Sequence, residues 1–409
     1  MKRNTAHWAS AALIAVAAFV LVAPVDCAHG QDGTDNRWLS PTLIAARTHR
    51  FDANLNYLTF QHMNKLFPTR TVRASDGVWE LPIALRDIDA RLELRGEVVD
   101  LDGFFERTRT NAFLVIKNGR IVHETYRNGS DRSTRFIGFS MSKSIVATLI
   151  GLALHDGHIG TLDDLVTDYL PELEGSGYEG VSIRNVLRMR SGVAWEESYS
   201  FGSDSQAATV AENTMVRHNY RWCDYAADES VRGVAPGSVF NYSTLDTGVL
   251  GCVLERAVGK KGSDYMAEKL WQPAGMEADA FWIMDGPEPI GREFFGAGFN
   301  ATLRDFGRFG LMILNGGKAN GRQVVSAEWV AAATVPDEGY EPVAPGADRG
   351  YQYQWWTLPR SNAFLAVGLH NQYIYINPDN DVVIVKLSYG GGEEGVIERF
   401  EHIARMLAE

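Results

Sequence analysis

A serine and a lysine stand three residues apart where a long apolar segment begins. Ser140 and Lys143 precede small and apolar residues as far as Ala153, a pattern that predicts a buried helix. Residues three apart share a helix face, so the two side chains can meet. A buried lysine with a lowered pKa can take the proton of a serine hydroxyl and make it a nucleophile. Standing alone, this spacing more often marks a serine N-cap followed by a solvated lysine.

A tyrosine farther along the chain is a candidate proton carrier. Pro236-Gly237 predicts a turn, and Tyr242 follows it at the head of an apolar, helix-like run. A lysine ammonium beside a tyrosine favours the phenolate, so we expect a lowered pKa for Tyr242. Such a phenol can move a proton between nucleophile and leaving group. The alternative is a core tyrosine near a turn.

These residues lie within motifs that resemble a known family. Their order and residue types are similar to those of the class C β-lactamase and penicillin-binding-protein superfamily, over about residues 105 to 408. Within it they most resemble the branch of esterases and 6-aminohexanoate-dimer (nylon-oligomer) hydrolases. The resemblance implies that Ser140 is the nucleophile, Lys143 its general base, and Tyr242 the residue that assists proton transfer to the leaving group. Thr244 stands where the family often has asparagine. The motifs are Phe139-Ser140-Met141-Ser142-Lys143-Ser144, Leu187-Arg188-Met189-Arg190-Ser191-Gly192-Val193, and Pro236-Gly237 through Tyr242-Ser243-Thr244.

The third family signature, Lys-Thr-Gly, does not occur in the chain. Its expected counterpart is Gly368-Leu369-His370-Asn371-Gln372, where a backbone N–H near Asn371 would complete an oxyanion hole with that of Ser140. His370 is mostly neutral at pH 7, so it binds a substrate carboxylate less well than lysine does. The alternative for His370 is a buried structural histidine. Esters and linear amides are therefore favoured over β-lactams.

The loop after Trp195 supplies two further candidates. Tyr199 matches, by the same resemblance, a tyrosine that contacts the substrate amide in the nylon-oligomer hydrolases. Asp204, in the polar stretch that follows, is expected to meet a substrate amine. Surface decoration is the alternative for Tyr199.

The pattern of the remaining chain predicts strands at both ends and helices between them. Asn118-Gly119 separates two β-rich runs and predicts a hairpin before the Ser140 helix. Further strands are expected at 371–376 and 382–387, with a final helix from about 394 to 407. The expected fold class is α/β (α+β): an antiparallel β-sheet flanked by helices, plus a large helical subdomain over about 160–330 in which 300–312 is one helix. The two sheet-forming ends must then meet.

The first 30 residues have the features of a secretory signal peptide. Lys2 and Arg3 precede an apolar run from Trp8 to Val25, and small residues follow near Ala28. We therefore expect a signal peptide over 1–30, an N-terminal extension of unassigned role over 31–104, and the hydrolase-like domain over 105–409. An exported protein, periplasmic or secreted, follows from cleavage. An uncleaved anchor is the alternative and the only membrane contact expected.

Composition excludes several partners. The net charge of −12, without a basic run, argues against nucleic acid and anionic membrane surfaces. No Cys, His and carboxylate cluster has metal-ligand spacing, so neither a metal nor another cofactor is expected. Cys223 and Cys252, the two cysteines beyond the leader, can form one disulfide, but two free or buried thiols are favoured.

The sequence thus predicts an exported serine hydrolase that cleaves a small-molecule ester or linear amide through an acyl-enzyme on Ser140. A D-alanyl-D-alanine carboxypeptidase or a β-lactamase is the nearest alternative. A catalytically silent scaffold on the same fold is the alternative from a different class, although a scaffold does not need Ser140, Lys143 and Tyr242 together.

Overall fold

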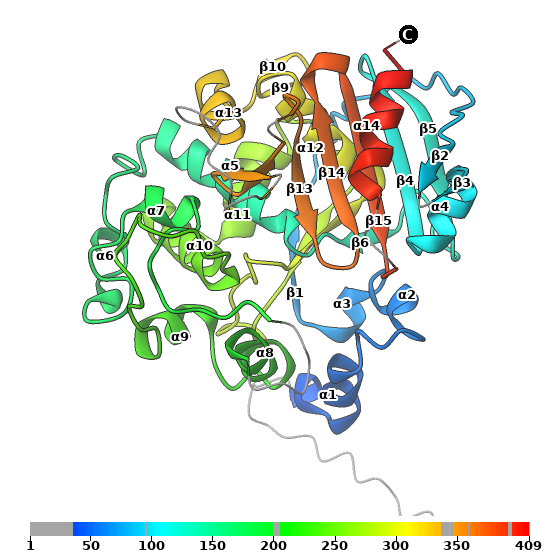
Figure 1. The fold of residues 1–409 in the computed structure, drawn as a ribbon. Helices are drawn as coiled ribbons and strands as arrows, with labels where there is room; N and C mark the ends of the chain where they lie inside the picture. Colours follow the sequence, from blue (N-terminus) through cyan, green and yellow to red (C-terminus); the bar gives the residue numbers. More distant parts are fainter. Residues whose placement is uncertain are drawn as a thin grey trace, which may run out of the picture. The chain divides into compact units, whose positions relative to one another are not determined.

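The computed structural model describes residues 36–94, 96–198, 205–336, 343, 347, 349–358, 360–391 and 395–408. The expected signal peptide lies outside these residues. Asn36–Glu409 form one compact unit, which includes the N-terminal extension from Asn36 onward (Figure 1).

Strands from both ends of the chain form one antiparallel sheet in the order β11-β12-β13-β14-β15-β4-β5. The C-terminal β15 pairs with the early β4, with Val385 opposite Leu114. The expectation that the two sheet-forming ends meet is therefore confirmed. The strands are β4 (Thr110–Lys117), β5 (Arg120–Tyr126), β11 (Gly350–Gln352), β12 (Trp355–Thr357), β13 (Phe364–Gly368), β14 (Gln372–Asn377) and β15 (Val382–Ser388).

The hairpin between β4 and β5 forms where Asn-Gly predicts it. Asn118 and Gly119 have φ values of 51° and 71°, and two positive φ values in succession are what a type I′ turn requires. Alternate side chains of β4 enter two different cores. Leu114 packs on the side of helices α5 (Met141–His155) and α12 (Leu303–Leu314), whereas Phe113 packs on the side of α4 (Leu101–Arg107) and α14 (Val396–Met406).

The helical middle of the chain also contains strands. Residues 300–302 belong to β8, so the expectation of one helix over 300–312 was wrong at its start. Thr302 ends the strand and caps α12, because its side chain accepts a hydrogen bond from the Asp305 N–H. A second antiparallel sheet has the order β1-β7-β8-β6, made of β1 (Thr69–Val72), β7 (Ala280–Ile283), β8 (Phe299–Thr302) and β6 (Arg135–Ile137).

The remaining elements surround these two sheets. The helices and helical turns are η1 (Asn36–Leu39), α1 (Pro41–Thr48), α2 (Asn56–Thr59), α3 (Met63–Leu66), α6 (Val166–Tyr169), η2 (Pro171–Leu173), α7 (Ile183–Leu187), α8 (Gln206–Ala211), η3 (Glu212–Val216), α9 (Trp222–Asp228), α10 (Thr244–Val258), α11 (Gly262–Met266), η4 (Ala267–Trp271), α13 (Ala327–Thr334) and η5 (Pro378–Asn380). Two small hairpins pair β2 (Leu92–Leu94) with β3 (Glu97–Val99) and β9 (Lys318–Ala319) with β10 (Arg322–Gln323). Within the described parts of the chain, no helix has the length and apolar character needed to cross a membrane.

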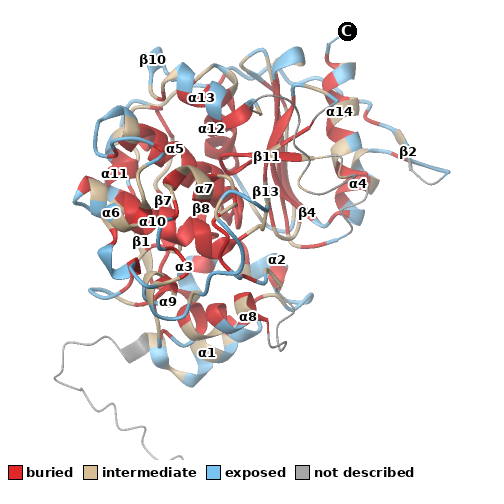
Figure 2. Cartoon of the chain, turned by 60° about the vertical axis from the view of Figure 1, so that its left-hand side comes forward, coloured by how far each residue is buried: buried red, intermediate tan, exposed pale blue. Residues whose placement is uncertain are grey.

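Helix α5, which carries Lys143, lies in the core. Every residue from Met141 to Ala153 is buried, and α5 packs against α10, β13 and β14 (Figure 2). The buried helix predicted from the apolar run is confirmed. Ser142 and Ser144, which the spacing turns away from Lys143, bond elsewhere: Ser142 Oγ accepts from the Phe299 N–H, and Ser144 Oγ donates to the Gln354 carbonyl.

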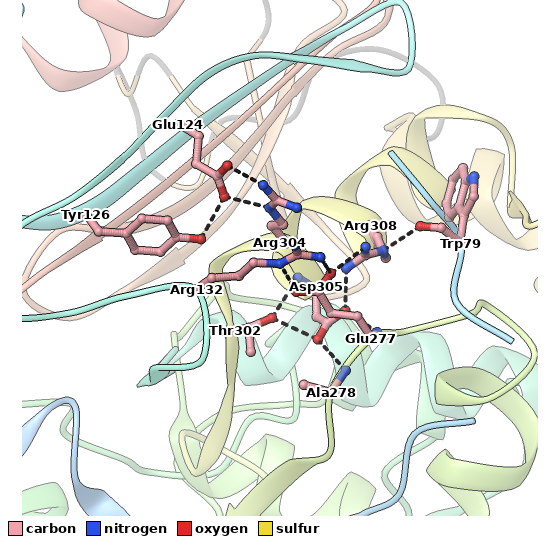
Figure 3. A network of polar contacts seen from close by, with 10 residues as sticks. All are labelled: Trp79, Glu124, Tyr126, Arg132, Glu277, Ala278, Thr302, Arg304, Asp305 and Arg308. Carbon is pink, nitrogen blue, oxygen red and sulfur yellow. Dashed lines mark hydrogen bonds and ion pairs between the residues drawn. The ribbon is translucent and has the colours of Figure 1, made fainter. Parts of the chain in front are cut away.

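A partly buried polar network fixes α12 to the main sheet (Figure 3). Arg304 donates two hydrogen bonds to Glu124 of β5, at 2.7 and 2.6 Å. Burial alone would raise the pKa of the Glu124 carboxyl, but the hydrogen bonds from Arg304 and Tyr126 and the charges of Arg304 and Arg132 together outweigh it and lower the pKa. Arg308, one turn along α12, donates to Glu277 and to the Trp79 carbonyl. The network therefore ties β5, α12 and two loops together.

Cys223 and Cys252 form a disulfide that joins α9 to α10, with Cα atoms 6.3 Å apart. The preference for two free thiols was therefore wrong. The apolar run around Cys252 does pack as a helix, but α9 brings Cys223 beside it, and this tertiary contact is not visible in the spacing of two cysteines.

Candidate active site

Ser140 stands at the start of α5, directly after a strained residue. Phe139 has a φ of 45°, a left-handed conformation that costs a bulky residue free energy and persists only where packing enforces it. Its ring contacts those of Phe51 and Phe60. Ser140 is the N-cap of α5, yet its side chain makes no capping hydrogen bond. The hydroxyl is therefore available to Lys143 and is not used to end the helix.

Lys143 meets Ser140 as the three-residue spacing predicts. The Lys143 Nζ lies 3.0 Å from Ser140 Oγ, 3.0 Å from Thr244 Oγ1 and 2.8 Å from the Gly296 carbonyl oxygen. Only 1% of Lys143 is exposed. Burial lowers the pKa of Lys143 to about 8, although the charges of Glu197 and Asp246 act against that change. A substantial fraction of the side chain is therefore the neutral amine near pH 8.

Thr244 replaces the asparagine usual in the family and still contacts Lys143. Its Oγ1 donates to Glu197 Oε1, and the same oxygen accepts a hydrogen bond from Lys143 Nζ. Glu197 Oε2 accepts from the Thr244 N–H at 2.8 Å and from the Trp195 indole. A continuous chain of hydrogen bonds thus joins Lys143, Thr244 and Glu197.

The sequence analysis missed Glu197 as a site residue. Glu197 lies in the same segment as Tyr199, where the sequence offers two consecutive glutamates and no pattern that selects one. Glu196 is exposed, whereas Glu197 points back to the first turn of α10. The hydrogen bonds to Thr244 distinguish the two residues, and these depend on the tertiary fold.

Tyr242 lies beside the Lys143 amine, with Nζ 5.0 Å from the ring centroid. Its ring stacks on Trp356 at 5.6 Å and contacts Tyr351 edge to face. Burial raises the pKa of Tyr242, a hydrogen bond with Ser140 lowers it by less, and the Glu197 charge raises it further. The expectation of a lowered pKa was therefore wrong, because desolvation outweighs the Ser140 hydrogen bond. Tyr242 is a protonated phenol at neutral pH.

A buried carboxylate lies behind these residues. Asp246 on α10 accepts a hydrogen bond from the Tyr178 hydroxyl at 2.8 Å. Burial raises the pKa of Asp246 to about 7, although hydrogen bonds from Tyr178, Ser191 and Ser243 act against this change. Its charge and that of Glu197 both favour the protonated form of Lys143.

The end of strand β13 passes directly over the start of α5. A Cβ on Gly368 would lie 2.2 Å from the Gly138 carbonyl oxygen and 3.2 Å from the Ser140 nitrogen, so only glycine permits this approach. The proposed counterpart of the third motif is thus the turn from β13 to β14, beside Ser140. The Asn371 side chain donates to the Gly390 carbonyl at 2.9 Å. It helps to hold the turn.

His370 packs among aromatic rings. Its ring stacks on Phe51 at 5.3 Å and also contacts Phe60 and Phe139. Burial lowers the pKa of His370 to about 4, so the ring is neutral at pH 7. An uncharged imidazole offers no ionic contact to a substrate carboxylate.

Two predicted site residues, Tyr199 and Asp204, lie outside the described residues. In the part of the chain that is described, no three His, Cys, Asp or Glu side chains lie together as metal ligands would. The assembled groups are a hydroxyl, a buried amine with a lowered pKa, a protonated phenol and a helix N-terminus. Together they can support attack by Ser140 on a carbonyl carbon and protonation of a leaving group.

Known proteins share this combination of motifs and fold. The profile of the Beta-lactamase family matches residues 102–407. The chain belongs to the Beta-lactamase family. A 6-aminohexanoate-dimer hydrolase of Paenarthrobacter ureafaciens is 31% identical over 347 residues, which are 82% of this chain and 86% of that protein. Esterase EstB of Burkholderia gladioli is 28% identical over 49% of this chain and 54% of its own.

A solved structure has the same fold. The protein named "Putative 6-aminohexanoate-dimer hydrolase from Bacillus anthracis" superposes with a TM-score of 0.79 at 25% identity, over 88% of this chain and 96% of that chain. The chain is therefore a hydrolase of the β-lactamase type, with an antiparallel sheet and a helical region as the sequence predicts. The resemblance inferred from the motifs is confirmed.

Proposed function

We propose that this protein is an exported serine hydrolase that cleaves an ester or a linear amide through an acyl-enzyme on Ser140. The observation that carries the proposal is the 3.0 Å contact between Ser140 Oγ and a fully buried Lys143 amine. A base so placed, with a pKa lowered to about 8, can accept the hydroxyl proton near neutral pH.

Acylation begins when Ser140 Oγ attacks the substrate carbonyl carbon and its proton passes to Lys143 Nζ. The tetrahedral intermediate then collapses: the bond to the leaving group breaks, and the leaving alcohol or amine takes a proton from the Tyr242 hydroxyl. Lys143 returns its proton to Tyr242, close beside it. In deacylation, Lys143 takes a proton from water, the resulting hydroxide attacks the acyl carbon, and Ser140 leaves as a hydroxyl after reprotonation.

Two backbone N–H groups are suited to hold the oxyanion. The Ser140 N–H starts α5, where helix N–H groups are unpaired. Just before β13, the Ala363 carbonyl accepts a hydrogen bond from the Leu358 N–H, so the backbone groups of Ala363 face β12. In a strand the backbone groups of every second residue face the same neighbour. Continued to Leu369, the residue after β13, this alternation turns the N–H away from β14, and the preceding Gly368 lies next to Ser140. We therefore assign Leu369, two residues before Asn371, as the second donor.

Esters and linear amides fit this site better than β-lactams. The chain lacks the Lys-Thr-Gly signature, the His370 ring in the turn after β13 is neutral, and the Asn371 side chain is engaged with the Gly390 carbonyl. Two relatives, named as a 6-aminohexanoate-dimer hydrolase and an esterase, support the same choice of substrate class.

Export is proposed from the first 30 residues, whose charged start and apolar run are typical of a signal peptide. The Cys223–Cys252 disulfide supports it, because disulfides persist in oxidising compartments such as the periplasm. Mass spectrometry of protein recovered from the periplasm tests it: an N-terminus near Gln31 is expected, and an intact Met1 in the cytoplasm would contradict export.

Purified protein assayed with p-nitrophenyl butyrate, the linear 6-aminohexanoate dimer and nitrocefin tests the catalytic proposal. We expect turnover of the ester or the linear amide that Ser140→Ala removes, with little hydrolysis of nitrocefin. A Ser140→Ala protein that keeps its turnover would exclude Ser140 as nucleophile. Rapid nitrocefin hydrolysis would instead assign the protein to the β-lactamases.

A further inference from the structure

A small apolar cavity is lined partly by chain neighbours of the catalytic groups and partly by the N-terminal extension. Three lining residues are neighbours of the chemical groups: Phe139 precedes Ser140, Ala297 follows the Gly296 carbonyl that binds Lys143, and Leu369 is the second oxyanion donor proposed above. We propose that this cavity is the acyl pocket, and that it accepts a short, uncharged, apolar acyl group. The inference rests on the proposed serine hydrolase function.

Residues before the family match form one wall of this cavity. Phe51 and Met63 line it, and the Beta-lactamase profile begins only at residue 102. Arg47 holds the extension in place, since its guanidinium donates to the Leu66 carbonyl at 2.7 Å and to the Val216 carbonyl of η3 at 2.8 Å. In both views of the fold α1 lies beside α8, which η3 continues (Figures 1 and 2). The extension, which the sequence left without a role, thus becomes part of the substrate site.

The cavity lies on the acyl side of the scissile bond. Tyr242 donates the proton to the leaving group, so the leaving group must lie toward Tyr242 and its neighbours Trp356 and Tyr351. None of these three residues lines the cavity. The acyl substituent, on the other side of the reacting carbon, is the part of the substrate that can enter it.

The size and polarity of the cavity determine which acyl group it can accept. The cavity volume is about 40 Å³, room for about three water-sized groups, which suits an acyl chain of about three or four carbons. Apart from Arg50, the lining side chains are apolar. Burial lowers the pKa of Arg50 to about 9, so it stays a cation at pH 7. The Glu212 charge acts on Arg50 and offsets its repulsion of a second cation. An acyl group with a terminal ammonium would still lose its hydration in this apolar cavity, a cost that an apolar acyl group avoids.

The test compares esters that differ only in the acyl group. We expect wild-type kcat/KM to fall about tenfold or more from p-nitrophenyl butyrate to octanoate, and from p-nitrophenyl hexanoate to 6-aminohexanoate. Met215→Ala enlarges the cavity and should raise the octanoate to butyrate ratio about tenfold. Met266→Ala is the matched control, because Met266 is equally buried but does not line the cavity. Its ratio should stay within about twofold of wild type.

Each ratio is internal to one variant, so a smaller folded fraction does not change it. An unchanged ratio in an active Met215→Ala protein, or the same increase in Met266→Ala, would overturn the acyl pocket. Preference for the 6-aminohexanoate ester over the hexanoate would overturn the requirement for an uncharged group. If no ester shows turnover that depends on Ser140, the proposed function itself fails. That outcome differs from Ser140-dependent turnover whose octanoate to butyrate ratio does not change in Met215→Ala.

Discussion

Replacing Glu197 by glutamine should move the pH profile of catalysis to lower pH. The base acts as the neutral amine of Lys143, and the Glu197 charge stabilises the ammonium form and so raises its pKa. Removing that charge lowers the pKa, and the neutral amine then persists at lower pH. The perturbation is nearly isosteric, since glutamine still accepts a hydrogen bond from the Thr244 N–H.

The size of the expected pKa change follows from the distance between the Lys143 ammonium and the Glu197 carboxylate, which are linked by two hydrogen bonds through Thr244. With Thr244 Oγ1 between them, Lys143 Nζ and the Glu197 carboxylate are about 6 Å apart. At an effective dielectric constant of about 20 the interaction is about 3 kcal/mol, equivalent to about 2 in pKa. Partial exposure of Glu197 reduces the expected change in the pKa of Lys143 to between about 1 and 2. The pKa of Lys143, about 8 in the wild type, should fall to between about 6 and 7.

The assay is kcat/KM for p-nitrophenyl butyrate between pH 5 and 9. The acidic limb should have its midpoint near pH 8 in the wild type and about 1 to 2 lower in Glu197→Gln. Glu196→Gln is the matched control, because it removes an equal charge from the adjacent, exposed residue. A limb that stays near pH 8 in Glu197→Gln, or moves equally in Glu196→Gln, would refute the electrostatic coupling. Glu197→Gln also lowers the pKa of Asp246, because the Glu197 charge raises it. The Asp246 carboxylate then ionises at lower pH and favours the Lys143 ammonium, so the change in Lys143 lies toward the lower end of this range.

Three further outcomes follow from the same contacts. Tyr242→Phe should lower kcat by about 10² to 10⁴ with little change in melting temperature, because only the phenol proton is lost; wild-type kcat would remove its assigned role. Replacing both Cys223 and Cys252 by alanine removes a cross-link between residues 29 apart in the sequence and should lower the free energy of unfolding by about 3 to 4 kcal/mol. Urea titration measures this, and an unchanged unfolding midpoint would contradict it. Arg304→Ala should cost about 2 kcal/mol at pH 7, because the half-buried Glu124 carboxylate loses its ion-pair partner and keeps only the Tyr126 hydrogen bond. The loss should shrink as the pH falls and Glu124 is protonated, and a loss independent of pH would point to packing instead.

Much of the fold could be predicted because its signals are local. The Asn118-Gly119 turn and the apolar run after Ser140 depend on neighbours within a few residues, and both elements form as expected. The start of α12 was misplaced because residues 300–302 have no local pattern that separates a strand end from a first helical turn. Pairing of β8 with β6 and β7 decides it.

The sequence by itself determined the family and the pairing of Ser140 with Lys143, since a spacing of three residues on a helix brings the two side chains together wherever that helix lies. Only the tertiary structure decided which site residues are protonated at neutral pH and which residues line the cavity. Desolvation raises the pKa of Tyr242 and lowers that of Lys143, and Glu197 reaches Thr244 from another segment. The burial of these side chains and the lining of the cavity depend on segments far apart in the chain, so they cannot be predicted from local spacing.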